Sequence, residues 1–279
     1  MFYISKKSIF RIIPYLIVLF FATITIVPIF WVFSTSIKPM SEIRTWPPYW
    51  IPKHPQFISY VRIFTTRPFL QYTANSVIVA SVSTAICVLL GLFTGYSLSR
   101  KKFKGKTAIA LLILATRLFP PIALISPWYG LASKFNLINT HLVLIIAYIY
   151  MNLPFVVWIM LGFFDRIPRE IDDAGKIDGC NKLSLLRYIL IPLAGPGIAT
   201  ASIFTFLLSW NEYLLAAVLT VSPSAKTIPV GVMEFISDEF IVWNQLCSAS
   251  IMASIPAVVF VLLFQQYIVK GLTAGAVKG

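Results

Sequence analysis

Charged residues are scarce in this chain of 279 residues. They make up 12% of it, whereas an average soluble domain has about a quarter, and the hydrophobic set reaches 58%. This imbalance excludes an ordinary water-soluble fold. Aromatic residues make up 15% and no low-complexity tract occurs, which excludes a disordered chain. The composition is therefore typical of an integral membrane protein.

Histidine and cysteine are also rare. The two histidines and three widely spaced cysteines, with no CxxC pair, indicate neither a zinc site nor a disulfide framework. No Gly-x-Ser-x-Gly motif occurs either, so we predict no catalytic residue, no metal ligand and no cofactor on this chain. A membrane enzyme of another type stays as an alternative.

A phosphate-binding loop is missing as well. Gly105-Lys106-Thr107 matches the end of that motif, but Arg100 stands where its first glycine is required. The segment also opens an apolar stretch, so the match is interpreted as chance.

Long uncharged stretches dominate what is present. Each exceeds the ~20 residues that a helix needs to cross the hydrocarbon core. Arg117 and Glu212 are the ionisable exceptions well inside them. We predict an all-α integral membrane protein with six transmembrane helices, at residues 12–37, 68–99, 107–133, 135–164, 188–219 and 240–269.

The basic residues predict the orientation of these spans. If the N-terminus is cytoplasmic, fifteen lysines and arginines lie in inside segments and seven in outside segments. This asymmetry favours both termini in the cytoplasm, with the chain in the plasma or inner membrane. Because the net charge of +13 gathers at span ends, it does not indicate nucleic acid.

The predicted organisation follows from these spans. Residues 1–11 form a cytoplasmic N-terminus, 12–270 a six-span domain and 271–279 a C-terminal tail. Within the domain, a proline-rich extracytoplasmic loop covers about 34–67, and a charged cytoplasmic loop covers 165–192.

The cytoplasmic loop contains signals for a short helix. Pro168 suits a helix start, and Glu170, Asp172 and Asp173 follow in the first turns, where the helix dipole favours carboxylates. Gly179 can adopt a positive φ and end that helix.

A second helix is predicted directly after it. Asn181 is a plausible N-cap, and Pro192 suits the turn into the fifth span. The leucines spaced three and then four apart give an expected apolar face of Leu183, Leu186 and Leu190. The loop could simply join two spans, but an insertion of this length with caps and an apolar face favours a docking element.

The loop resembles the EAA loop of ATP-binding-cassette (ABC) importer permeases. That motif runs Glu-Ala-Ala, three residues, Gly, about nine residues and Ile-x-Leu-Pro. The matching positions here are Asp173-Ala174-Gly175, Ile177-Asp178-Gly179 and Ile189-Leu190-Ile191-Pro192, with Asp, Gly and Ile replacing Glu, the second Ala and Leu. A resemblance to carbohydrate-type permeases extends over most of the chain, including Ser209–Tyr213.

The resemblance implies a type I importer permease fold and a coupling helix seated in an ATPase subunit. Asp173 would pair with that partner, Ala174 and Gly175 would allow close approach, and Gly179 would set the turn. The implied coupling loop comprises Glu170, Asp173, Ala174, Gly175, Asp178, Gly179, Ile189 and Pro192.

The resemblance also implies the partners. They are a second permease, expected to be a homologous different chain, an ATPase dimer that carries ATP and Mg²⁺, an extracytoplasmic solute-binding protein, membrane lipid and a di- or oligosaccharide. The alternative function is an ion-coupled secondary transporter that acts without an ATPase.

Polar residues in the spans are candidates for the substrate pathway, because ionisable groups there are costly. Each has a structural alternative: Arg117 could cap carbonyls freed by Pro120-Pro121, Glu212 could pair with another helix, and the rest could pack. The candidates are Asn75, Arg117, Ser209, Asn211, Glu212 and Tyr213. By resemblance, the binding protein would contact Thr227, Pro229 and Gly231 in the outside loop.

Overall fold

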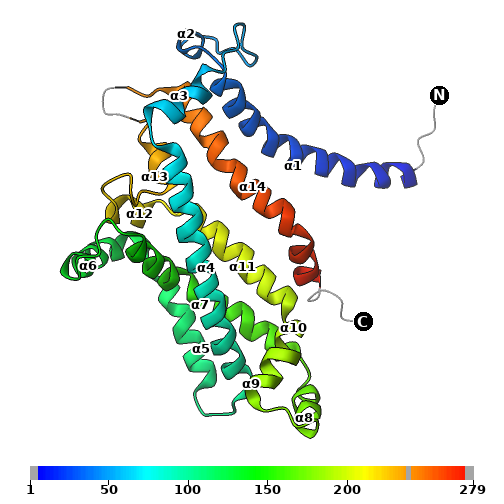
Figure 1. Cartoon of the computed structure of the whole chain (residues 1–279). Coiled ribbons are helices and arrows are strands. Elements are labelled where there is room, and N and C mark those ends of the chain that lie inside the picture. The colour runs from blue at the N-terminus through cyan, green and yellow to red at the C-terminus, as the bar shows by residue number, and fades with distance from the viewer. Residues whose placement is uncertain (1–5, 237–239, 274–279) are drawn as a thin grey trace. The chain divides into compact units, whose positions relative to one another are not determined.

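The computed structural model describes residues 6–236 and 240–273 (Figure 1). Within these ranges the chain is helical, and the only β-type pairing described is an isolated antiparallel bridge between Ile236 and Ile241. The predicted all-α class is therefore confirmed. The chain divides into two compact units, Met1–Arg67 with Val232–Ser254, and Pro68–Gly231 with Ile255–Gly279.

Four single helices are long and apolar enough to cross a membrane. They correspond to the first, second, fourth and sixth predicted spans. They are α1 (Lys6–Ser36), α4 (Phe69–Arg100), α7 (His141–Arg166) and α14 (Trp243–Thr273).

The third and fifth predicted spans are bent helix pairs. α5 (Lys106–Ala115) continues into a 3₁₀ turn at Thr116–Leu118 and then meets α6 (Pro121–Lys134) at 91°. The break lies at Pro120-Pro121, as the sequence predicts, because proline disrupts the helical hydrogen-bond ladder. The segment Lys182–Leu193 meets α11 (Gly195–Trp210) at 75°. Six spans result if each bent pair crosses once.

The first unit contains α1, the short helices α2 (Met40–Ile43) and α3 (Ile58–Thr66), and the start of α14. Its proline-rich loop is held by Glu42, whose carboxylate accepts from the backbone N–H groups of Lys53 (3.0 Å) and His54 (2.9 Å). Lys38 is buried. Its Nζ donates to the Tyr49 carbonyl and lies 4.3 Å from the Trp31 ring centroid. Burial lowers the pKa of Lys38, and Glu42 opposes that shift.

The core of the second unit is the packing of α4 against α7. A Cβ atom on Gly91 would lie 2.5 Å from Val156 Cγ1, and one on Gly95 would lie 2.8 Å from Met160 Cβ. The two small residues of the Gly91-x-x-x-Gly95 pattern thus allow α4 and α7 to approach closely. α11 packs against both helices, and its Phe206 stacks 4.0 Å from Phe260 of α14.

Shorter helices complete the second unit. α12 (Leu214–Leu219) and α13 (Ile228–Met233) follow α11, while α8 (Arg169–Ile177), α9 (Lys182–Leu185), the π-helical turn η2 (Leu186–Leu190) and α10 (Ile191–Leu193) form the loop between α7 and α11. In the first unit, α1 already begins at Lys6, inside the predicted N-terminal segment. α14 passes residue 270, and tail residues 274–279 lie outside the described residues.

Candidate functional site

α8 forms where the sequence predicts it. It follows Pro168, carries Glu170 and Asp172 in its first turn, and ends before Gly179 at φ 82°. The Cys180 N–H then donates to the Gly175 carbonyl at 2.9 Å. A left-handed residue with such a back-bond satisfies the last carbonyls of a helix, so the glycine at 179 serves this turn.

The second helix confirms its predicted cap and corrects its predicted face. Asn181 Oδ1 accepts from the backbone N–H groups of Leu183 (3.0 Å) and Ser184 (2.9 Å). Leu183 itself is 65% exposed, so its expected place on the buried face is wrong. The buried face is Leu185, Leu186 and Leu190. The π turn η2 explains this register, because i to i+5 bonding places residues five apart on one side.

The inner face of α8 is fixed by an ion pair. Arg100, the last residue of α4, places Nη2 2.9 Å from Asp172 Oδ2 and Nε 3.1 Å from Oδ1. The same guanidinium donates to the carbonyls of Phe164 (3.0 Å) and Ile167 (3.1 Å). Both charged side chains are nearly buried, at 12% and 11% exposure. α8 is therefore tied to the ends of α4 and α7.

This pair was missed by sequence reasoning. From sequence, Asp172 is explained only by the helix dipole, and Arg100 enters only as the residue that breaks the phosphate-binding-loop match. Because the two residues are far apart in sequence, no local spacing signals the contact. The two adjacent acidic residues Asp172 and Asp173 are the one available hint. Neighbouring positions on a helix face different directions, so the two carboxylates are not expected to share one role.

Gly175 also faces inward, which corrects its expected role in contacting a partner. A Cβ atom there would lie 2.6 Å from Leu185 Cδ1 and 3.2 Å from Ile189 Cδ1. The residue thus permits α8 to approach the second helix of its own loop. Ile189, a predicted coupling residue, contributes to this internal contact.

The outer face of α8 is exposed along its length. We define it as Glu170, Asp173, Ala174 and Ile177. Ile177 is 86% exposed and lies beside charged residues. Asp173 Oδ1 lies 2.7 Å from Lys176 Nζ, and this contact lowers the pKa of Asp173 and raises that of Lys176. Asp178, Gly179 and Pro192 are also exposed. This mixture suits a protein partner.

Two polar candidates in the membrane helices have internal roles. Asn75 Nδ2 donates to the carbonyls of Pro223 (3.0 Å) and Lys226 (2.9 Å), and its Oδ1 lies 3.0 Å from His141 Nε2. Ser209 Oγ accepts from Asn152 Nδ2 at 3.1 Å and from Ser83 at 3.3 Å, which joins α11 to α7 and α4. Both residues are buried, as the structural alternative requires.

Glu212 caps α12. Its carboxylate accepts from the backbone N–H groups of Leu215 (2.9 Å) and Ala216 (3.1 Å). Among the described residues no ion pair joins it to Arg117, so the suggested pairing is not observed. Asn211 and Tyr213 beside it are exposed, and Asn211 Nδ2 donates to the Leu207 carbonyl at 2.8 Å. These two residues keep polar atoms near the surface.

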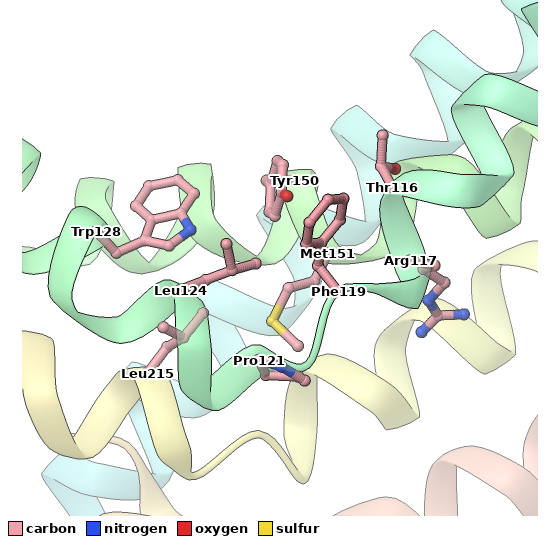
Figure 2. A pocket seen from close by; sticks show the side chains of 9 residues that line it. All are labelled: Thr116, Arg117, Phe119, Pro121, Leu124, Trp128, Tyr150, Met151 and Leu215. Carbon is pink, nitrogen blue, oxygen red and sulfur yellow. The ribbon is translucent and has the colours of Figure 1, made fainter.

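A cavity of about 210 Å³ lies at the break between α5 and α6 (Figure 2). Arg117 and Thr116 come from the 3₁₀ turn, Trp128 from α6 and Tyr150 from α7. The Trp128 and Tyr150 rings pack edge to face, with centroids 5.6 Å apart. Arg117 lies 5.2 Å from the Phe155 ring centroid. The complete lining is Thr116, Arg117, Phe119, Pro121, Leu124, Trp128, Tyr150, Met151 and Leu215.

Trp128 and Tyr150 were not among the predicted site residues. Aromatic residues fill many apolar runs of this chain, and spacing alone does not tell a cavity wall from a packed core. The proline pair beside Arg117 was the usable signal, because a broken helix leaves space between its two halves.

The loop candidates at 227–231 are mostly inaccessible, which corrects their expected exposure. Thr227 and Gly231 are buried, and a Cβ atom on Gly231 would clash with the Tyr72 ring. Pro229 alone is partly exposed. The Ile228 N–H donates to Ser76 Oγ at 2.7 Å, so α4 holds this segment. The exposed part of the connection between α12 and α13 lies earlier in the sequence, at Val221, Pro223 and Ser224. Within the described ranges, no group of three or more His, Cys, Asp or Glu side chains could hold a metal ion.

Relatives are similar in sequence to this chain over 79% to 99% of its length. A permease protein of the Agrobacterium fabrum sulfoquinovosyl glycerol transport system is 33% identical, covering 90% of this chain and 88% of the relative. The trehalose/maltose transport system permease protein MalG of Thermococcus litoralis is 36% identical, covering 79% and 81%. An inner membrane ABC transporter permease protein of Escherichia coli, YcjP, is 34% identical, covering 99% of both chains.

Solved structures share the fold. A chain of a bacterial ABC transporter involved in the import of the polysaccharide alginate superposes with a TM-score of 0.80 at 22% identity, covering 96% of this chain and 99% of the other. The family model for the binding-protein-dependent transport system inner membrane component matches residues 87–274. This match favours an ABC importer permease over the ion-coupled secondary transporter that the sequence left as an alternative. The chain belongs to this family, the inner-membrane permease subunits of ABC importers, whose ATPase is a separate chain.

Proposed function

We propose that this permease subunit imports a sugar and that the outer face of α8 binds the ATPase. The observation that carries the proposal is the division of α8 into two faces. Asp172 and Gly175 hold the helix through contacts with other parts of this chain. Asp173, Ala174 and Ile177 are exposed and can contact a partner. A helix held rigidly from one side can transmit a movement applied to the other.

The contacts around α8 suggest how that movement reaches the membrane. The ATPase would bind ATP and Mg²⁺, and closure of its dimer would displace α8. The Arg100–Asp172 pair would carry the displacement to α4, and the contact of Gly175 with Leu185 and Ile189 would carry it towards α11. Close-packed interfaces move as bodies rather than deform, so α4 and α7 would move together.

The cavity beside Arg117 suits a sugar. Aromatic faces such as Trp128 and Tyr150 can stack on the apolar face of a sugar ring, while Thr116 and Arg117 can hydrogen-bond to hydroxyl groups. The names of relatives that transport trehalose, maltose and diacetylchitobiose support a di- or oligosaccharide. Asn211 and Tyr213 remain further candidates for the pathway.

The remaining subunits follow from the same function. A second permease, homologous to this chain but different from it, would complete the pathway. An extracytoplasmic solute-binding protein would contact the exposed tip at Val221, Pro223 and Ser224, with partly exposed Pro229. This arrangement requires both termini in the cytoplasm, on the side of α8.

The test is purification of the tagged chain with its co-expressed subunits, followed by ATPase and uptake assays in vesicles. Asp173→Lys reverses the charge on the outer face and Gly179→Trp strains its positive-φ turn. Both are expected to lower the recovered ATPase and sugar uptake about tenfold or more. Gln56→Lys is the matched control, because it adds a lysine at an exposed position in the first unit. Normal ATPase recovery and uptake with Asp173→Lys and Gly179→Trp would contradict the docking assignment.

A further inference from the structure

The connection between α4 and α5 is short and strongly basic. Residues 101–105 alone join the two helices, and Lys101, Lys102 and Lys104 lie within them. Lys106 follows as the first residue of α5. Because the apolar run of α5 begins directly after Lys106, the connection is expected to lie close to the level at which α5 enters the membrane.

A hollow of about 620 Å³ opens at this connection. Arg169, the first residue of α8, reaches it from the neighbouring loop, and its Nη2 lies 3.3 Å from the Ser99 carbonyl. Lys106 Nζ lies 3.4 Å from the same carbonyl. The lining is Lys101, Lys102, Phe103, Lys104, Gly105, Lys106, Thr107 and Arg169.

The positive charge of the hollow is largely uncompensated. Among the described ion pairs of its five cationic residues, the one contact is from Lys106 Nζ to Asp165 Oδ1, at 3.7 Å. The N-cap of α5, Gly105, offers no side-chain cap, and the N–H of Lys106 donates to the Phe103 carbonyl at 3.4 Å. Phe103 is 43% exposed beside the lysines. Clusters of lysine and arginine directly beyond an apolar helix are typical of sites that bind anionic lipid headgroups.

We propose that this basic hollow binds the phosphate group of an anionic phospholipid. The connectivity of α4 and α5 places the cations at the headgroup level, which favours a lipid over a soluble phosphate. The lysines alone could be explained by their effect on the orientation of the chain in the membrane. That explanation does not account for Arg169, which comes from a different loop and lines the same hollow. A bound phosphate would join the α4–α5 connection to the start of α8. That consequence rests on the proposed function of α8, but lipid binding itself does not.

The experiment measures lipid retained by the purified complex. The chain is purified with its subunits into nanodiscs of phosphatidylglycerol and phosphatidylcholine, re-extracted into mild detergent and analysed by native mass spectrometry. Each cation removed is expected to weaken phosphatidylglycerol binding about fivefold. The triple variant Lys102→Gln, Lys104→Gln, Arg169→Gln should therefore lose it about a hundredfold.

Two further variants keep the result interpretable. Lys102→Arg with Lys104→Arg preserves charge and should retain the lipid. Lys134→Gln with Arg44→Gln removes cations elsewhere and should also retain it. Equal phosphatidylglycerol retention by the triple variant would overturn the proposal. Displacement of the lipid by millimolar inorganic phosphate, with phosphate then bound, would assign the hollow to a soluble anion instead. Because retention needs no ATPase, it stays informative if the docking assignment fails.

Discussion

Polar residues serve opposite purposes in the α8 loop and in the membrane helices. Asn75, Ser209 and Glu212 each find hydrogen-bond partners within the chain, so their chemistry holds helices and loops together. On the outer face of α8, Glu170 and Asp173 stay exposed beside a bare isoleucine. The difference teaches that a polar residue inside a span is first explained by packing, since an unpaired buried group is costly.

The largest effect is expected where the two regions join. Arg100→Gln leaves the Asp172 carboxylate nearly buried without its cation, which should cost about 3 kcal/mol of unfolding free energy. The measurement is thermal unfolding of the purified complex, with ATPase recovery as a second readout. Arg187→Gln is the matched control, because Arg187 is an exposed arginine in the loop that contains α8. An unchanged unfolding temperature would show that the pair does not hold α8.

A smaller loss is expected from Asn75→Ala. It removes the donor to the Pro223 and Lys226 carbonyls and should cost about 2 kcal/mol. Because Asn75 lies away from α8, ATPase recovery should stay normal. Limited proteolysis at 221–226 provides the check, with faster cleavage expected. A variant that loses sugar uptake at unchanged stability and unchanged cleavage would instead return Asn75 to the substrate pathway.

Glu212→Gln should have a still smaller effect. The amide keeps one oxygen acceptor for the N–H groups of Leu215 and Ala216, so the expected cost is about 1 kcal/mol. Assembly should survive, and uptake per assembled complex should fall less than twofold. A severe loss of uptake by fully assembled complexes would give Glu212 a direct role in transport.

The smallest effect concerns pH at the outer face of α8. Lys176 lowers the pKa of Asp173, so the stability from this pair is present above the ordinary pKa of an aspartate and is lost as the pH falls through the lowered value. Asp173→Asn and the unchanged chain should therefore differ in unfolding temperature by a constant small amount from pH 6 to 8. That difference should shrink only in acid. A change within the neutral range would point to another partner for Asp173.

Local features of the loop were predictable from sequence because short-range rules govern them. Gly179 ends a helix through its positive φ, and Asn181 caps the next one through its own side chain. The proline pair at 120–121 likewise breaks its helix by local sterics. Periodicity failed at Leu183, because the π turn that follows changes the spacing of buried residues.

Long-range contacts were not predictable in the same way. The partners of Asn75 and Ser209 lie on other helices, and hydropathy does not show which side of a span faces them. Arg100 lies at the end of α4 and Asp172 in the loop after α7, so their contact depends on how these helices pack. The aromatic wall formed by Trp128 and Tyr150 depends on a 91° bend whose direction the sequence does not state.

The most direct test of the central claim is a cross-link from the outer face of α8. A photoreactive amino acid at Ile177, which is 86% exposed, should cross-link to the ATPase in the purified complex. The same amino acid at Tyr129 of α6, which is also exposed, should not. An assembled, active complex in which position 177 gives no ATPase cross-link would contradict the account.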